Sequence, residues 1–115
     1  MSLSTHALDA ERGRPIALLE VNLLRHIPHE EDRATWPVHA LRGRWQLEAG
    51  GRTDERGRLD FLYDLEQPGL YRLIFDTSRE FYPEVVITFR VADPTEHYHI
   101  PLLLSSYSYT TYRGS

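Results

Sequence analysis

The 115-residue sequence predicts an all-β protein built as a sandwich of short strands. Apolar and polar residues alternate with a period of two along several short runs, which are rich in β-branched and aromatic side chains. Clusters of Gly, Pro and acidic residues separate these runs. No stretch shows the 3.6-residue period of an amphipathic helix. A chain of this length is expected to form one domain over residues 1–115.

The predicted strands follow one another along the chain. The first segment alternates only weakly, with Leu3, Thr5 and Ala7 on one side and Ser4, His6 and Leu8 on the other. The stronger runs are residues 19–23, 59–63, 71–75, 85–91 and 97–104. Turn signals lie at residues 11–15, 50–51, 54–57, 67–69 and 92–94. Residues 28–44 show no period and predict a long loop.

Composition excludes several classes of function. The chain has no cysteine, so a disulfide framework, a thiolate metal site and a cysteine nucleophile are excluded. All 13 basic residues are Arg, which excludes a Schiff-base lysine. The net charge of -4 gives no basic field for nucleic acid. The opening segment MSLSTHALD has no hydrophobic signal region and no apolar run is long enough to cross a membrane, so a soluble cytoplasmic protein is expected.

The last predicted strand carries two histidines on one face. Its apolar face is expected to point to the core, which turns His97 and His99 away from it. The pair suits hydrogen bonding across strands at the surface, or metal ligation with a third ligand such as His6. Pro101 cannot donate a ladder hydrogen bond and predicts an edge position or a bulge. The expected core face consists of Tyr98, Ile100, Leu102 and Leu104.

Two further features have both an ordinary and a functional interpretation. Arg58 begins a strand after a turn, where an arginine is usually solvated; its planar fork also suits a carboxylate-like or imide-like ligand edge. The tail over residues 105–115 holds Tyr107, Tyr109 and Tyr112 among serines and threonines. Such tyrosines are typical of a subunit interface or of a site, and the two are compatible if the site lies at the contact.

Three separated segments resemble the 5-hydroxyisourate hydrolases, the transthyretin-related enzymes of purine breakdown. They are LSTHALDAERGRP (residues 3–15), RTDERGRL (52–59) and the long segment from YPEVV to the terminal YRGS (82–115). LYRLIFDT (70–77) is also similar to the family. Transthyretin itself shares the fold and is not expected to keep the YRGS end.

The resemblance implies a fold and an assembly. The fold is a transthyretin-like antiparallel β-sandwich with little or no helix, since the segment that carries a short helix in relatives is reduced to residues 78–81. Conversely, residues 25–44 are longer than the usual connection between the second and third strands. The implied assembly is a homotetramer, a dimer of dimers with sites where the dimers meet. No cofactor and no metal are implied.

The resemblance also implies an activity and its residues. The reaction is hydrolysis of 5-hydroxyisourate to 2-oxo-4-hydroxy-4-carboxy-5-ureidoimidazoline in urate degradation. The active-site residues of the family fall on His6, Arg58, His99 and Tyr112, and Ser115 is expected to help position the tail. His6, Arg58 and Tyr112 are also the expected substrate-binding residues.

The residues present indicate how such a reaction would run. There is no cysteine and no serine in a nucleophile-elbow motif, so general acid–base catalysis on water by histidine is the economical mechanism. Arg58 would hold the ring and stabilise developing negative charge, and Tyr112 would orient the substrate. Which histidine is the base stays open. Two alternatives are a transthyretin-like protein that binds a small ligand without turnover and a metal-dependent hydrolase built on His97 and His99.

Overall fold

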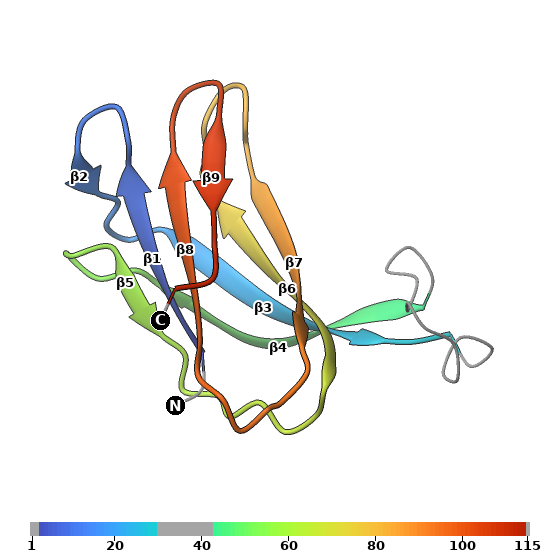
Figure 1. Cartoon of the computed structure of the whole chain (residues 1–115). Helices are drawn as coiled ribbons and strands as arrows, with labels where there is room; N and C mark the ends of the chain where they lie inside the picture. The colour runs from blue at the N-terminus through green and yellow to red at the C-terminus, as the bar shows by residue number, and fades with distance from the viewer. Residues whose placement is uncertain (1–2, 30–42, 115) are drawn as a thin grey trace.

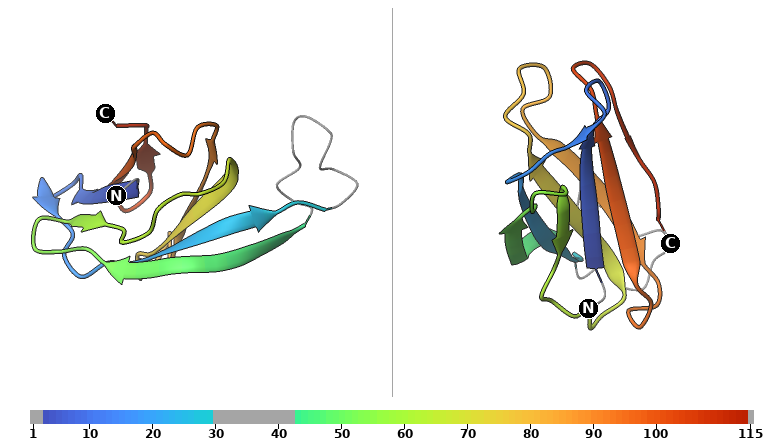
Figure 2. Two further views of the ribbon diagram at one scale, coloured as in Figure 1. Left: turned by 90° about the horizontal axis from the view of Figure 1, so that it is seen from below. Right: turned by 90° about the vertical axis from the view of Figure 1, so that its left-hand side faces the viewer.

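The computed structural model describes residues 3–29 and 43–114, which form two packed β-sheets (Figure 1, Figure 2). One sheet has the strand order β2-β1-β8-β9, with β5 also paired to β1, and the other has the order β4-β3-β6-β7. The strands are β1 (Leu3–Asp9), β2 (Arg14–Pro15), β3 (Glu20–Ile27), β4 (Arg44–Arg52), β5 (Arg58–Asp60), β6 (Gly69–Asp76), β7 (Val85–Val91), β8 (Tyr98–Leu104) and β9 (Tyr109–Thr111). The predicted sandwich is confirmed.

Among the strands of the described residues, pairing is antiparallel with one exception. The first strand, β1, runs parallel to β8 and places Leu3 opposite Tyr98 and Asp9 opposite Leu104. On its other edge, β1 pairs antiparallel with β5 and then with β2. The first strand, β1, and the penultimate strand, β8, therefore lie side by side in the middle of one sheet (Figure 1).

The core lies between the two sheets and follows the predicted alternation. Along β8, the four predicted core residues are all buried. Along β1, Leu3, Thr5 and Ala7 are fully buried, and the Thr5 hydroxyl donates to the Ile100 carbonyl at 2.6 Å. Because β1 keeps this register, its alternate side chains point to the outer face of the sheet. The opposite sheet contributes Val21, Leu23, Tyr71, Leu73, Phe75, Val85, Ile87 and Val91 to the core.

The sequence prediction missed β4 and placed a turn inside it. Gly50 and Gly51 lie within this strand rather than at a turn. A Cβ at Gly50 would lie 2.4 Å from Oδ1 of Asn22, and one at Gly51 would lie 3.0 Å from Cδ1 of Leu59. Neighbouring side chains thus lie close to both glycines.

Other boundaries also differ from the prediction. β3 continues to Ile27 and β4 begins at Arg44, so the predicted loop over 28–44 is shorter at its end; residues 30–42 of it lie outside the described residues. β5 ends at Asp60; the next residue, Phe61, is buried in the core and donates its N–H to the Leu3 carbonyl. The short strands β2 and β9 were not predicted as strands.

Pro101 does not lie on an edge strand, because β8 is flanked by β1 and β9. Its carbonyl accepts a hydrogen bond from the Thr111 hydroxyl at 2.7 Å, on the side of β9. The nitrogen of a strand residue faces the same neighbour as its carbonyl, and β9 ends at Thr111. The nitrogen of Pro101, which has no hydrogen to donate, therefore faces the end of β9, where the hydrogen bonds between β8 and β9 are interrupted.

The described residues contain no helix, in agreement with the prediction for the shortened segment at 78–81. No helix in the described part of the chain could therefore cross a membrane.

The turn at residues 54–57 is a test of the local packing. Gly57 has a φ of 77°, and a Cβ there would lie 2.3 Å from the Ala7 carbonyl oxygen. Gly13 has a similar φ of 65° with nothing within 4 Å. We expect Gly13→Ala to lower the free energy of unfolding by about 1 kcal/mol and Gly57→Ala by roughly 2–4 kcal/mol. Urea denaturation measures both values, and equal losses would contradict the collision with β1.

Candidate active site

The outer face of β1 is the centre of the candidate site. β1 lies between β5 and β8, so each outward residue of β1 has a partner on both sides. Ser4 is opposite Asp60 on one side and opposite His99 on the other. His6 is opposite Arg58 and opposite Pro101. Directly opposed residues in a sheet share a face, which gathers these side chains outside the core.

A tight turn positions Arg58 at the start of β5. The Asp54 carboxylate accepts hydrogen bonds from the N–H groups of Arg56 and Arg58 at 2.8 Å and 3.0 Å. These bonds stabilise the charged carboxylate and hold the pKa of Asp54 below its usual range; the bond from Arg58 has the largest effect. Gly57 closes the turn and accepts from the Ala7 N–H at 2.8 Å. The turn thus joins Arg58 to the middle of β1.

His6 is held by the same turn. Its Nε2 lies 2.8 Å from the Arg56 carbonyl oxygen. A carbonyl only accepts, so Nε2 carries a proton, and neutral His6 has an unprotonated Nδ1. The imidazole is therefore oriented by the backbone and retains one nitrogen that can accept a proton.

His99 is oriented by Ser4. The Ser4 hydroxyl lies 2.8 Å from His99 Nδ1 and 3.1 Å from His97 Nε2. Ser4 is buried, with 6% of its surface exposed. Within the described residues, Nε2 of His99 makes no hydrogen bond, so it is the ring nitrogen open to proton exchange.

The C-terminal tail folds back over β8 and closes one side of the site. The Gly114 N–H donates to the His99 carbonyl at 2.7 Å, and a Cβ at Gly114 would lie 2.4 Å from Cδ2 of the His99 ring. Only a glycine allows this approach. The Arg113 guanidinium lies 4.4 Å from the centre of the Tyr98 ring and 3.8 Å from the Glu96 carboxylate. The arginine thereby fastens the tail to β8.

These elements surround a polar pocket of about 440 Å³. Three of the four predicted catalytic residues line it: Arg58, His99 and Tyr112. The fourth, His6, does not line it but lies directly opposite Arg58 in the sheet. Ser115 lies outside the described residues. The remaining lining residues are Ser4, Asp60, His97 and Gly114.

Sequence reasoning missed three of these residues as parts of the site. Asp60 lies two positions after Arg58 on the same strand face, so the period of two could have indicated it. Ser4 lies two positions before His6 and could have been found in the same way. Gly114 had no local signal, because its role depends on contact with the His99 ring.

The charges around His99 favour its neutral form. Burial lowers its pKa below the ordinary value of 6.5, and the positive charge of Arg58 lowers it further. His6 and His97 act in the same direction, whereas Asp60 raises the pKa. Half-buried His99 is therefore a neutral imidazole at pH 7, the state required of a general base.

The arrangement does not form a recognisable metal centre. Among residues 3–29 and 43–114, no group of three or more His, Cys, Asp or Glu side chains could hold a metal ion. The facing nitrogens of His97 and His99 both bond to the Ser4 hydroxyl. The pocket is instead suited to a small polar ligand whose edges carry hydrogen-bond acceptors or negative charge.

Comparison with known proteins places the chain in a family. The model of the HIUase/Transthyretin family matches residues 3–114. The chain belongs to this family. A 5-hydroxyisourate hydrolase of Salmonella dublin is 37% identical, with 98% of this chain and 80% of that protein covered.

A plant relative is longer. The uric acid degradation bifunctional protein TTL of Arabidopsis thaliana is 40% identical over 98% of this chain, which spans only 37% of that protein's length.

Solved structures of the family have the same fold. The 5-hydroxyisourate hydrolase of Klebsiella pneumoniae has a TM-score of 0.74 and 25% identity, with each chain fully covered. Sea bream transthyretin in complex with thyroxine has a TM-score of 0.79 and 26% identity, with 99% of this chain and 95% of that chain covered. Proteins of this fold therefore include some named for hydrolysis and one solved with bound thyroxine.

The charge around His99 predicts a specific titration. In the folded protein, the His99 ring is expected to titrate below 6.5, so the neutral base persists to lower pH. Arg58→Gln removes a neighbouring positive charge and should raise this pKa. NMR titration of the ring signals measures the pKa in each protein.

Arg56→Gln is the matched control, since Arg56 lies in the same turn and is not among the groups that shift His99. An unchanged His99 pKa in Arg58→Gln, or an equal rise in both variants, would show that Arg58 does not face His99.

Proposed function

We propose that this chain hydrolyses 5-hydroxyisourate at the pocket beside β1, opening its six-membered ring by attack of water on the ring amide. The observation that carries the proposal is the convergence of Arg58, His99 and Tyr112 on one polar pocket, with His6 opposite Arg58 in the sheet. These residues are far apart in the sequence. The relatives named 5-hydroxyisourate hydrolase support the substrate.

His99 acts as the general base in this proposal. It lines the pocket, its Nε2 is open, and its surroundings favour the neutral ring. Water gives a proton to Nε2 as its oxygen attacks the ring carbonyl. His6, whose Nε2 is bonded to the Arg56 carbonyl, keeps Nδ1 available and assists proton transfer from the neighbouring position on β1.

Arg58 and Tyr112 bind and orient the substrate. The guanidinium of Arg58 presents a planar pair of donors to an oxygen and nitrogen edge of the ring, and its charge stabilises the developing oxyanion. The Tyr112 side chain is 56% exposed, so its hydroxyl is available to a ligand. Products would leave through the solvent-facing side of the pocket.

The alternative is a transthyretin-like protein that binds a small ligand without turnover. A structure of sea bream transthyretin contains thyroxine, and this chain has the same fold. Pockets for drug-sized ligands are mostly apolar, however, with few polar groups. The pocket here is lined by charged and polar side chains apart from Gly114, which favours the hydrolase.

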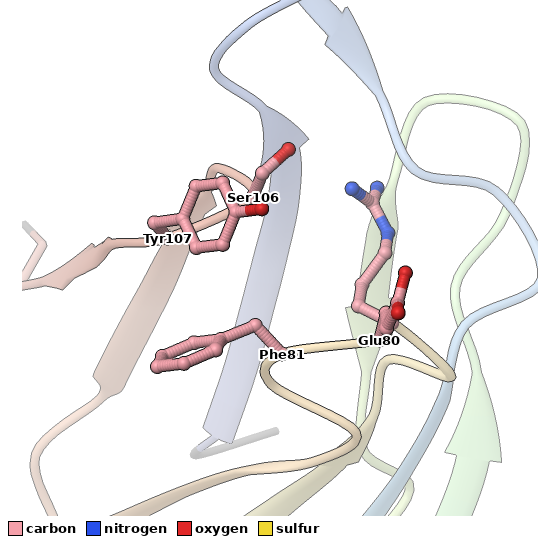
Figure 3. Close-up of a pocket in the computed structure, with 5 residues that line it drawn as sticks. Glu80, Phe81, Ser106 and Tyr107 are labelled. Atoms are coloured by element: carbon pink, nitrogen blue, oxygen red, sulfur yellow. The ribbon is translucent and has the colours of Figure 1, made fainter.

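We also propose a homotetramer, formed as a dimer of dimers with the tails at the sites. Exposed aromatic residues support an interface between copies of this chain. Phe81 and Tyr107 are 60% and 77% exposed. The centres of their rings are 5.4 Å apart, and both residues line a second pocket of about 280 Å³ (Figure 3). Tyr82 packs edge-on against Tyr109 at 5.2 Å, which extends this aromatic patch.

The patch brings together the loops after β6 and β8, at the top of Figure 1. Apolar area of this kind, with hydroxyl groups at its rim, is typical of protein interfaces. The predicted single domain over 1–115, the cytoplasmic location and the supporting role of Ser115 stay predictions.

Rapid mixing with freshly generated 5-hydroxyisourate tests the activity directly. The protein should accelerate the loss of substrate absorbance well beyond spontaneous decay, and chelators should not slow it. His99→Asn should lower turnover by roughly 100-fold or more, the range typical of lost general acid–base catalysis. Arg58→Lys should also be damaging, because an ammonium group lacks the planar fork.

His97→Asn is the matched control for the histidine, because it changes the neighbouring imidazole on the same side of β8. It should reduce turnover less than His99→Asn. Equal effects would contradict the assignment of the base. Wild-type turnover in Arg58→Lys would show that Arg58 is only a solvated strand residue, and decay at the spontaneous rate in the wild type would overturn the hydrolase.

Sedimentation velocity tests the assembly. The wild type should sediment as a tetramer at micromolar concentration. A double change of Phe81→Ser and Tyr107→Ser should shift the population to smaller species, because it removes the exposed aromatic area. Leu62→Ser is the control, since Leu62 is 90% exposed and lies outside the aromatic patch. A fully active wild-type monomer would refute sites shared between subunits.

A further inference from the structure

The Ser4 hydroxyl lies between two imidazoles on the outer face of the sheet. Its oxygen is 2.8 Å from His99 Nδ1 and 3.1 Å from His97 Nε2. Ser4 is only 6% exposed and has Asp60 and His99 as its partners in the ladders. The three side chains therefore form a short hydrogen-bonded chain that begins at the pocket.

A hydroxyl has a single proton, so Ser4 can donate to only one of the two rings and must accept from the other. If it donates to His97 Nε2, His99 donates its Nδ1 proton to Ser4, and Nε2 of neutral His99 is basic. If it donates to His99 Nδ1, neutral His99 carries its proton on Nε2 and cannot act as the base there. The orientation of one hydroxyl thus couples the protonation of both histidines.

We propose that Ser4 is a positioning residue that holds neutral His99 with a basic Nε2 and carries a proton from His99 to His97 during turnover. The inference rests on the proposed hydrolysis at this pocket. It gives His97, which is not one of the residues expected from the family resemblance, a role as the end of a relay.

The transfer balances in protons and bonds. When His99 Nε2 takes a proton from the attacking water, the ring becomes an imidazolium. Its Nδ1–H bond breaks as the proton passes to the Ser4 oxygen, and the original Ser4 proton passes to His97 Nε2. His99 is then neutral and His97 carries the charge. The reverse transfer restores the imidazolium at His99, which protonates the leaving ring nitrogen.

The charges around the two rings explain why the transfer is useful. Positive charge on His99 is opposed by Arg58 from β5 and by His6 from β1, with Asp60 as the counter-charge; Tyr112 faces the same pocket from the tail. His97 is exposed to solvent, which stabilises a charged ring.

Two charged residues near His97 in the described part of the chain are Arg113 and Glu96. The Arg113 guanidinium lies 3.5 Å from the His97 carbonyl oxygen and pairs with the Glu96 carboxylate at 3.8 Å, so a neutralising carboxylate accompanies this cation. Moving the positive charge from His99 to His97 therefore reduces the repulsion between positive groups beside the substrate.

Two variants of nearly equal shape test the hydroxyl. S4T keeps the hydroxyl and S4V replaces it with a methyl group. We expect S4V to lower kcat by about 10- to 100-fold, by analogy with the loss of a partner that orients a metal-bound imidazole. S4T should recover most of this loss. S4A serves in place of S4V if thermal unfolding shows that the added methyl groups disturb the fold.

Ring nitrogen NMR gives a readout that a purely structural role would not move. At neutral pH, wild-type His99 should show a protonated Nδ1 and an unprotonated Nε2. S4V should lose this preference, because nothing then accepts the proton on Nδ1 of His99. This measurement needs no substrate, so it tests the relay even if the protein is not a hydrolase.

A double-mutant cycle completes the test. Because S4V and H97N interrupt the same relay, their combined effect on kcat should be close to that of S4V alone. Independent effects that multiply would overturn the relay. An unchanged His99 tautomer and wild-type kcat in S4V would also overturn it, while leaving hydrolysis by the wild type intact. Failure of hydrolysis with the expected tautomers would instead reject the proposed function.

Discussion

The parallel pairing of β1 with β8 is the constraint on which the site depends. It sets Ser4 beside His99, two residues separated by 95 positions, while β5 brings Arg58 and Asp60 to the other edge of β1. Because side chains alternate along a strand, a slip of one residue would turn Ser4 and His6 into the core and expose Thr5. The buried contacts of Leu3, Thr5 and Ala7 therefore fix the register that the polar face uses.

Strand β1 and the tail up to Gly114 are both held by contacts with β8. The N-terminal strand lies inside a sheet, and the tail is tied to β8 by a backbone hydrogen bond at Gly114 and by the contacts of Arg113 with Tyr98 and Glu96. Terminal segments are usually loose unless they are fastened in this way. The docked tail contributes Tyr112 and Gly114 to the pocket, so the proposed chemistry depends on the tail being held in place.

In the proposed mechanism, the electrostatics of the pocket favour both a neutral His99 and the negative charge that develops on the substrate. Arg58, His6 and His97 all disfavour a proton on His99, and burial acts in the same direction. The same positive charge that keeps His99 neutral would stabilise the oxyanion formed by attack of water. Binding and base catalysis are therefore served by one group of charges, and the Ser4 relay would remove the charge that this group opposes.

The sequence alone determined the sandwich class and the faces of the strongly alternating strands, because burial of one face imposes a period of two on the chain itself. This pattern correctly separated His99 from the core residues of β8, and the family resemblance added Arg58 and Tyr112, which the structure places with it. The sequence did not reveal β4, whose paired glycines resemble a turn signal, or β2 and β9, which are too short to show a period. Only the tertiary structure decided that Ser4 bridges two histidines and that Gly114 packs on a ring, because both contacts arise from pairing between strands that are distant in the sequence.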